Sequence, residues 1–217
     1  KITIKIVEQS IQLHVKPVYV KHEIFHNNHL VKRLSNEFAI FVEDLDDIPE
    51  NANVIFSAHG VAKKISEEAI NNKLNVFDAT CPLVTKVHLE AIKLYKNGYH
   101  IFLIGHDGHP EIEGTRGQVP EDSITLIQTV EEAETVKAPN KRLAWLSQTT
   151  LSVDDTTEIV TTLTVRFNDI LGPKKVDICY ATTNSQPAVQ EIAPFVDIML
   201  VVGSANSSNS HRLVDVS

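Results

Sequence analysis

The stretch NVFDATCPLVTKVHLEAIKLYKNGYHIFLIG, residues Asn75–Gly105, holds one complete strand–helix–strand unit. Asn75–Phe77 and His100–Ile104 are apolar runs of strand length, and a partial apolar stripe predicts a helix over Pro82–Lys96 between them. Proline suits the first turn of a helix, and Gly98 can end this one. A strand, a helix and a second strand in this order predict an α/β unit with parallel strands.

The same alternation of apolar runs and amphipathic segments continues on both sides of this unit. Further strands are expected at Pro17–Val20, Phe38–Val42, Asn53–Ser57, Thr125–Ile127, Leu143–Leu146 and Asp197–Val202. Further helices are expected at Ile2–Leu13, Asn28–Ser35, Ala62–Asn72, Val130–Val136, Val153–Phe167 and Gln186–Ile192. Ile55–Gly60, Leu103–His106 and Val201–Ser204 each run from a strand into a Gly, Ser or His loop. This echo suggests two or three related α/β subdomains that face a common centre.

Length, hydrophobic content and charge narrow the class of protein. With 217 residues, 42% of them hydrophobic, the chain can bury a core and does not have the composition of a disordered protein. Its longest apolar runs, such as Ile198–Val202, are far too short to cross a bilayer, so no membrane segment is expected. The formal net charge is -8 and no Lys or Arg cluster stands out, so no nucleic-acid partner is expected.

Cys81 and Cys179 are the only cysteines of the chain, too few for a disulfide framework. Three interpretations stay open on this basis: buried reduced thiols, one isolated disulfide, or ligands of a shared metal centre. Buried thiols are the commonest of the three for free cysteines. Two thiolates alone do not complete a usual iron–sulfur site.

Polar side chains with catalytic or ligand chemistry follow several of the predicted strands. In open α/β sheets, ligands bind beyond the carboxyl ends of the strands, so we expect these residues to share one site. They are His59, Cys81, His106, His109, Thr149, Cys179, Ser207 and Asn209.

Several of these loop residues have both a chemical and a structural interpretation. The run Ser207–Ser210 can bind phosphate through hydroxyls and backbone N–H groups at a helix start, or it can simply cap that helix. His26, His59 and His109 can donate to phosphate oxygens, or they can form structural hydrogen bonds. Glu111 can supply a proton, or it can stabilise the first turn of a helix.

Taken together, these motifs resemble the hydroxymethylbutenyl diphosphate reductase family, also called LytB or IspH, of the non-mevalonate isoprenoid pathway. The resemblance runs in order through nearly the whole chain, which makes it far more specific than any single motif. The matching stretches are Val20–Asn27, Ser57–Val61, Phe77–Val84, Gly105–Thr115, Ser147–Ser152, Ile178–Asn184 and Gly203–Ser210.

The resemblance implies an α/β fold of three related subdomains, with mostly parallel sheets around a central pocket. These subdomains would span residues 1–80, 81–178 and 179–217, with the first and third incomplete. The family has another cysteine upstream of where Lys1 stands, and it continues beyond Ser217. We therefore expect a fragment that cannot hold an intact cluster or turn over substrate by itself.

The resemblance also implies a reaction and a role for each site residue. A [4Fe–4S] cluster would be held by three cysteines, two of which match Cys81 and Cys179. Glu111 matches the proton donor, and Thr149 matches the residue beside the substrate hydroxyl. The implied reaction is a two-electron reductive loss of hydroxyl from 4-hydroxy-3-methylbut-2-enyl diphosphate, which yields isopentenyl and dimethylallyl diphosphate. The groups that match the diphosphate site are His26, His59, His109, Ser207, Ser208 and Asn209.

The family implies a ferredoxin or flavodoxin as electron donor. It also implies a bacterial cytoplasmic or plastid protein, which is not expected to be secreted. Two alternatives stay open beside the reductase. One is a mononuclear zinc or iron hydrolase that uses His59, His106, His109 and a cysteine. The other is a truncated, non-catalytic domain.

Overall fold

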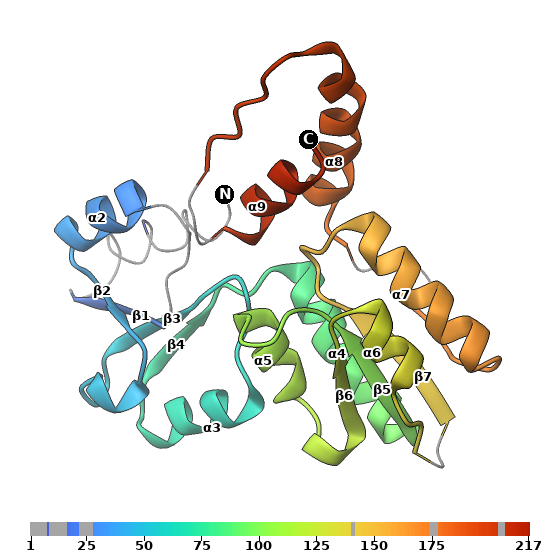
Figure 1. The fold of residues 1–217 in the computed structure, drawn as a ribbon. Helices are drawn as coiled ribbons and strands as arrows, with labels where there is room; N and C mark the ends of the chain where they lie inside the picture. Colours follow the sequence, from blue (N-terminus) through green and yellow to red (C-terminus); the bar gives the residue numbers. More distant parts are fainter. Residues whose placement is uncertain (1–7, 9–16, 22–27, 140–141, 174–177, 204–206) are drawn as a thin grey trace.

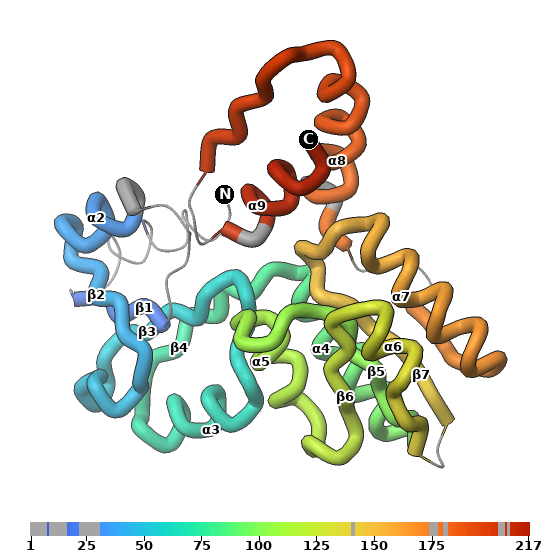
Figure 2. Tube along the Cα trace, in the orientation of Figure 1, coloured from blue at the N-terminus to red at the C-terminus, as the bar shows by residue number. Residues whose placement is uncertain are grey.

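The computed structural model of the chain has a mixed α/β architecture, described for residues 8, 17–21, 28–139, 142–173, 178–203 and 207–217 (Figure 1). Apart from Glu8, the expected helix Ile2–Leu13 lies outside these residues, as does His26. Two parallel sheets lie side by side, and the orange and red C-terminal segment lies on one side of both (Figures 1 and 2).

The first sheet is built from parallel strands in the order β2-β1-β3-β4. The strands are β1 (Val18–Lys21), β2 (Ala39–Val42), β3 (Asn53–Phe56) and β4 (Asn75–Asp78). The helical elements between them are α2 (Asn28–Asn36), η1 (Leu45–Asp47) and α3 (Lys63–Asn71). Each expected strand of this part of the chain is confirmed to within one residue at either end.

The second sheet is built from parallel strands in the order β6-β5-β7. The strands are β5 (Tyr99–Ile104), β6 (Ile124–Ile127) and β7 (Arg142–Ser147). The helical elements around them are α4 (Pro82–Lys96), α5 (Pro110–Arg116), η2 (Glu121–Ser123), α6 (Val130–Thr135) and α7 (Val153–Arg166). The helix expected at Pro82–Lys96 is confirmed with both bounds, and the two sheets confirm the expected α/β class.

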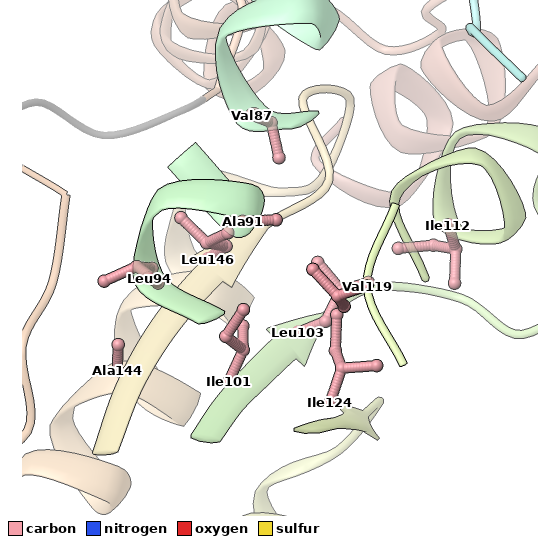
Figure 3. Close-up of a cluster of buried hydrophobic side chains, with 10 residues drawn as sticks. All are labelled: Val87, Ala91, Leu94, Ile101, Leu103, Ile112, Val119, Ile124, Ala144 and Leu146. Atoms are coloured by element: carbon pink, nitrogen blue, oxygen red, sulfur yellow. The ribbon is translucent and has the colours of Figure 1, made fainter. Parts of the chain in front are cut away.

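Strand β5 is buried on both faces and organises the core of the second sheet. Ile101 and Leu103 pack under α4 on one face (Figure 3), while Phe102 and Ile104 pack on the other face with side chains of α6 and α7. A strand covered on both sides must be apolar at every position, which explains the unbroken run in the sequence.

The C-terminal segment contains helices but no strand within its described residues. Its elements are α8 (Tyr180–Ile192), η3 (Ala193–Phe195) and α9 (Ser208–Asp215). The expected strand Asp197–Val202 is therefore wrong, because a strand needs a neighbour for its hydrogen bonds and none lies beside this run in the described chain. The helix expected at Gln186–Ile192 begins earlier, at Tyr180. Its first turns are rich in Thr, Asn and Ser, which favour turns and caps, so their composition hid the helix.

Candidate active site

The carboxyl ends of β3 and β4 place a histidine turn beside the first cysteine. After β3, Ser57–Gly60 form a tight turn closed by a hydrogen bond of 3.2 Å from Gly60 N to Ser57 O. Gly60 has a φ of 75°, a left-handed conformation that glycine adopts readily. Because β4 is the parallel neighbour of β3, the segment after it reaches the same edge, and Cys81 N donates to Ala58 O over 2.9 Å.

The loop after β5 brings a second histidine to His59. His109 caps α5, since its Nδ1 accepts a hydrogen bond of 3.2 Å from Glu111 N. An accepting Nδ1 carries no proton, so the neutral ring holds its proton on Nε2. The rings of His59 and His109 lie edge to face with their centroids 5.6 Å apart. Because His59 follows the first sheet and His109 the second, this contact joins the edges of the two sheets.

Glu111 is a buried carboxylate in the first turn of α5, with 1% of its surface exposed. Its Oε1 accepts from Thr149 N over 2.6 Å, and its Oε2 accepts from Thr149 Oγ1 over 3.0 Å. Thr149 follows β7, the neighbour of β5, which explains why the two residues meet. Thr149 O in turn accepts a hydrogen bond of 2.7 Å from Cys179 N. The second cysteine is thus bonded to the residue that holds Glu111.

An unbroken path of contacts connects Cys81 with Cys179. It begins at the turn that contains His59, crosses to His109 through the ring contact, continues along α5 to Glu111, and ends at Thr149. The structure therefore gathers loops that follow β3, β4, β5 and β7 into one place, although they are distant in the sequence.

Both cysteines are free thiols that are partly exposed, so the isolated disulfide is wrong. Each is the residue directly before a helix, Cys81 before α4 and Cys179 before α8. Sγ of Cys179 lies 2.9 Å from Oγ1 of Thr182 and accepts from Thr182 N over 3.4 Å.

His106 makes structural contacts with the C-terminal segment. Its Nε2 lies 2.8 Å from Nη2 of Arg212, which comes from α9, and its backbone N donates to Oε1 of Gln148 over 3.1 Å. Arg212 also pairs with Asp155 of α7 over 3.0 Å. Burial lowers the pKa of His106, the Arg212 guanidinium lowers it further, and Asp155 opposes both. The ring is thus favoured as a neutral acceptor for Arg212.

The serine-rich run lies at the start of α9, which the Arg212–His106 contact ties to the loop after β5. Oγ of Ser207 caps this helix by accepting from Ser210 N over 3.3 Å. Asn209 has a buried Oδ1 with no hydrogen-bond partner in the described part of the chain. This oxygen is an acceptor, so it calls for a hydrogen-bond donor, which an ionised phosphate does not supply.

The hydrolase alternative finds no support. Within the described ranges, no group of three or more His, Cys, Asp or Glu side chains is arranged to hold a metal ion. His106 faces Arg212 instead, and Nδ1 of His109 already accepts from Glu111 N.

Gln148 and Arg212 were not identified as site residues from the sequence. Gln148 is fully buried, and besides accepting from His106 it donates to Thr150 Oγ1 over 2.8 Å. The sequence offers one indication of this role, because Gln148 directly follows a strand and precedes Thr149. Arg212 had no such signal, because its partners lie far away in the sequence.

These features define the class: a mixed α/β protein in which the carboxyl edges of two parallel sheets share one polar site with two free cysteines. The family described as LytB protein matches residues 1–217. Reductases named 4-hydroxy-3-methylbut-2-enyl diphosphate reductase from Beijerinckia indica subsp. indica and Acidithiobacillus ferrooxidans are 57% and 53% identical over 97% and 98% of this chain. The matches cover 66% and 68% of those relatives, so the chain spans about two thirds of their length.

Two solved structures are also similar. The reductase structure from Plasmodium falciparum superposes with a TM-score of 0.95 at 42% identity, covering 99% of this chain and 67% of that one. A second solved structure, that of (E)-4-hydroxy-3-methyl-but-2-enyl diphosphate reductase, the terminal enzyme of the non-mevalonate pathway, superposes with a TM-score of 0.77 at 31% identity, covering 99% of this chain and 76% of that one. The chain therefore belongs to the LytB family, as its motifs indicated.

Proposed function

We propose that the protein is a 4-hydroxy-3-methylbut-2-enyl diphosphate reductase. It removes the substrate hydroxyl by a two-electron reduction and forms isopentenyl and dimethylallyl diphosphate. The observation that carries the proposal is the path of contacts between the two cysteines, with the buried Glu111 on it. Membership of the LytB family and the names of the relatives support the substrate. A non-catalytic domain would have no need for a buried carboxylate on a path of contacts between two free thiols.

Cys81 and Cys179 fit two ligand positions of a [4Fe–4S] cluster. Both are free and partly exposed, and the path of contacts between them supports a shared site. Thiolates are the usual ligands of such clusters, and a third cysteine ligand would not come from these 217 residues. When bound, the cluster supplies electrons and a Lewis acid for the leaving hydroxyl.

Glu111 is the proposed proton donor and Thr149 its partner. The backbone N–H of Thr149 fixes one carboxyl oxygen, and the rotatable hydroxyl of Thr149 meets the other. A proton on Oε2 of Glu111 can therefore pass to Oγ1 of Thr149 while the carboxyl group stays in place. Burial keeps the carboxyl group away from bulk water, so the proton goes to the substrate oxygen.

The diphosphate is assigned to imidazole and small polar groups. Nε2–H of His109 is suited to donate to a phosphate oxygen, and His59 lies beside it. Ser207 and Asn209 stand at the start of α9, where backbone N–H groups favour anions. His26 lies outside the described residues, and the side chain of Ser208 does too, so their roles rest on the family resemblance.

The proposal also covers the three subdomains, the electron donor and the location of the protein. The subdomains 1–80, 81–178 and 179–217 each supply part of the site, and a ferredoxin or flavodoxin provides the electrons. The location is the bacterial cytoplasm or a plastid. Among the described residues, no helix combines the length and the apolar character needed to cross a membrane.

The test compares Glu111→Gln with Glu113→Gln in the full-length gene product, loaded with its cluster and supplied with a chemical reductant. Glu113 lies on the same helix, but its side chain is exposed and faces Arg116. We expect Glu111→Gln to lower kcat about a hundredfold or more, with iron and sulfide content unchanged, and Glu113→Gln to stay within about twofold. Full activity of Glu111→Gln would remove the assigned proton donor. A loaded wild-type protein that consumes no substrate would overturn the function itself.

A further inference from the structure

One partly buried imidazole, that of His88, lies outside the path of contacts between the two cysteines. His88 lies in α4, about two turns after Cys81. Its Nε2 is buried and has no hydrogen-bond partner in the described part of the chain. An unpaired buried polar atom costs free energy, so a residue of this kind needs another reason to be there.

The ring of His88 packs directly against the backbone of Gly60. A Cβ atom added at Gly60 would lie 2.6 Å from Cε1 of His88 and 3.2 Å from Cγ2 of Thr80. Both distances are shorter than ordinary van der Waals contact, so the turn after β3 approaches α4 as closely as its backbone allows. Gly60 directly follows His59, so the ring supports the turn that carries this histidine.

The same ring also reaches α5, the helix that follows the loop after β5. A Cβ atom added at Gly114 of α5 would lie 3.4 Å from Nε2 of His88 and 3.4 Å from the carbonyl carbon of Gly60. Gly114 lies about one turn after Glu111 on this helix. His88, Gly60 and Gly114 thus form a close-packed junction of three elements, each of which carries a residue of the candidate site.

We propose that His88 is a positioning residue whose flat ring sets the distance between the His59 turn and α5. It thereby fixes how His59 and His109 face each other, and it does so without touching the ligand. The inference rests on the proposed function only where this histidine pair is taken to bind diphosphate.

The shape of the ring, and not its hydrogen bonding, does the positioning. Nε2 makes no hydrogen bond among the described residues, and this side of the ring is the one that lies against both glycines. Burial lowers the pKa of His88 to about 4, with Asp78 opposing, so the ring is neutral near pH 7 and can pack against uncharged backbone. A flat apolar ring should therefore replace His88, and a methyl group should not.

The experiment uses the full-length gene product with ¹³C-labelled histidine and two measurements: the ring signals of His59 and His109, and the affinity for inorganic pyrophosphate. His88→Ala leaves an empty space, so the turn that carries His59 and α5 can move toward each other. We expect it to shift both ring signals and to weaken pyrophosphate binding about tenfold. His88→Phe should keep both signals near their wild-type positions and the affinity within about threefold.

Leu94→Ala is the matched control, because Leu94 is buried in α4 but packs in the core of the second sheet (Figure 3). It should lower stability and leave the two ring signals in place. The proposal is overturned if His88→Ala leaves both signals unmoved, or if Leu94→Ala shifts them as much. If the full-length wild-type protein binds no pyrophosphate, the diphosphate assignment fails, and the ring signals alone still decide the role of His88.

Discussion

At the scale of single residues, the pairing of Glu111 with Thr149 shows how a buried carboxylate is oriented. Both oxygens accept from the same residue, one from backbone and one from a hydroxyl. A backbone donor cannot be removed by substitution, so only the hydroxyl contact is open to selective change. The backbone contact therefore orients the carboxyl group, and the hydroxyl contact provides the proposed route for the proton.

Thr149→Val keeps the backbone bond to Glu111 and removes the hydroxyl. We expect kcat of the cluster-loaded protein to fall about 10- to 100-fold, because the proton loses its path to the substrate. The free energy of unfolding should fall by about 1 kcal/mol, measured by urea denaturation, since one buried hydrogen bond is lost. Thr161→Val, at an exposed position of α7, should change neither quantity. Unchanged kcat in Thr149→Val would contradict the route.

The lowered pKa of His88 predicts a pH dependence of stability. The unfolded chain protonates this imidazole below about 6.5, whereas the folded chain resists protonation until about pH 4. The unfolded state therefore binds more protons in this window, and stability falls as the pH falls from 6.5 to 4.

The loss from His88 amounts to at most about 3 kcal/mol, taking about 1.4 kcal/mol for each pKa unit. His88→Phe cannot titrate, so its stability should fall less than that of wild type over the same range. Urea denaturation of both proteins at several pH values measures the difference. Parallel curves would show that His88 is solvated in the folded protein.

At the scale of elements, several helices begin at the candidate site with a side chain that caps them. His109 caps α5, Cys179 caps α8 and Ser207 caps α9, and Ser152 caps the nearby α7. Capping side chains satisfy backbone N–H groups that the first turn leaves free. The same residue types thus start the helices and line the site, so both interpretations of these loops can hold together.

Ser152→Ala tests one such cap apart from catalysis. Oγ of Ser152 accepts from Asp155 N over 3.2 Å, and Ser152 is buried, so its removal leaves a donor unpaired. We expect the free energy of unfolding to fall by about 1 kcal/mol. Thr157→Ala, on an exposed turn of the same helix, should change it by less than about 0.5 kcal/mol. Equal effects of the two would show that the cap contributes nothing.

At the scale of the whole molecule, the C-terminal segment exposes apolar side chains, whereas the two sheets bury most of theirs. Arg212 connects it to the second sheet through His106 and Asp155, but the run after η3 is left uncovered. Ile198, Leu200 and Val202 are 78%, 84% and 98% exposed. An exposed strip of alternating apolar residues favours association between chains.

The double substitution Ile198→Lys and Leu200→Lys tests this strip in the 217-residue chain. Because both side chains are exposed, we expect the melting temperature to stay within about 2 °C. Static light scattering should show less association at high protein concentration. Ile70→Lys, at an isolated exposed position of α3, is the control and should leave association unchanged. Equal scattering from the double variant and wild type would contradict the prediction.

The sequence alone determined the local elements and the family. The spacing of apolar residues and the residues that begin and end helices located α4 at both bounds and the strands of both sheets to within one residue. These signals are local, because each depends on only a few neighbouring residues. The strand expected at Asp197–Val202 failed because a strand depends on a neighbour that local pattern does not encode.

Only the tertiary structure decided which loops meet. The strand order places Thr149 beside Glu111, and the packing of the two sheets places His59 against His109. The contacts of His88 with the two glycines also depend on that packing. Such long-range contacts are set by the summed packing of the whole core, and no short stretch of the chain carries enough of that information to specify them.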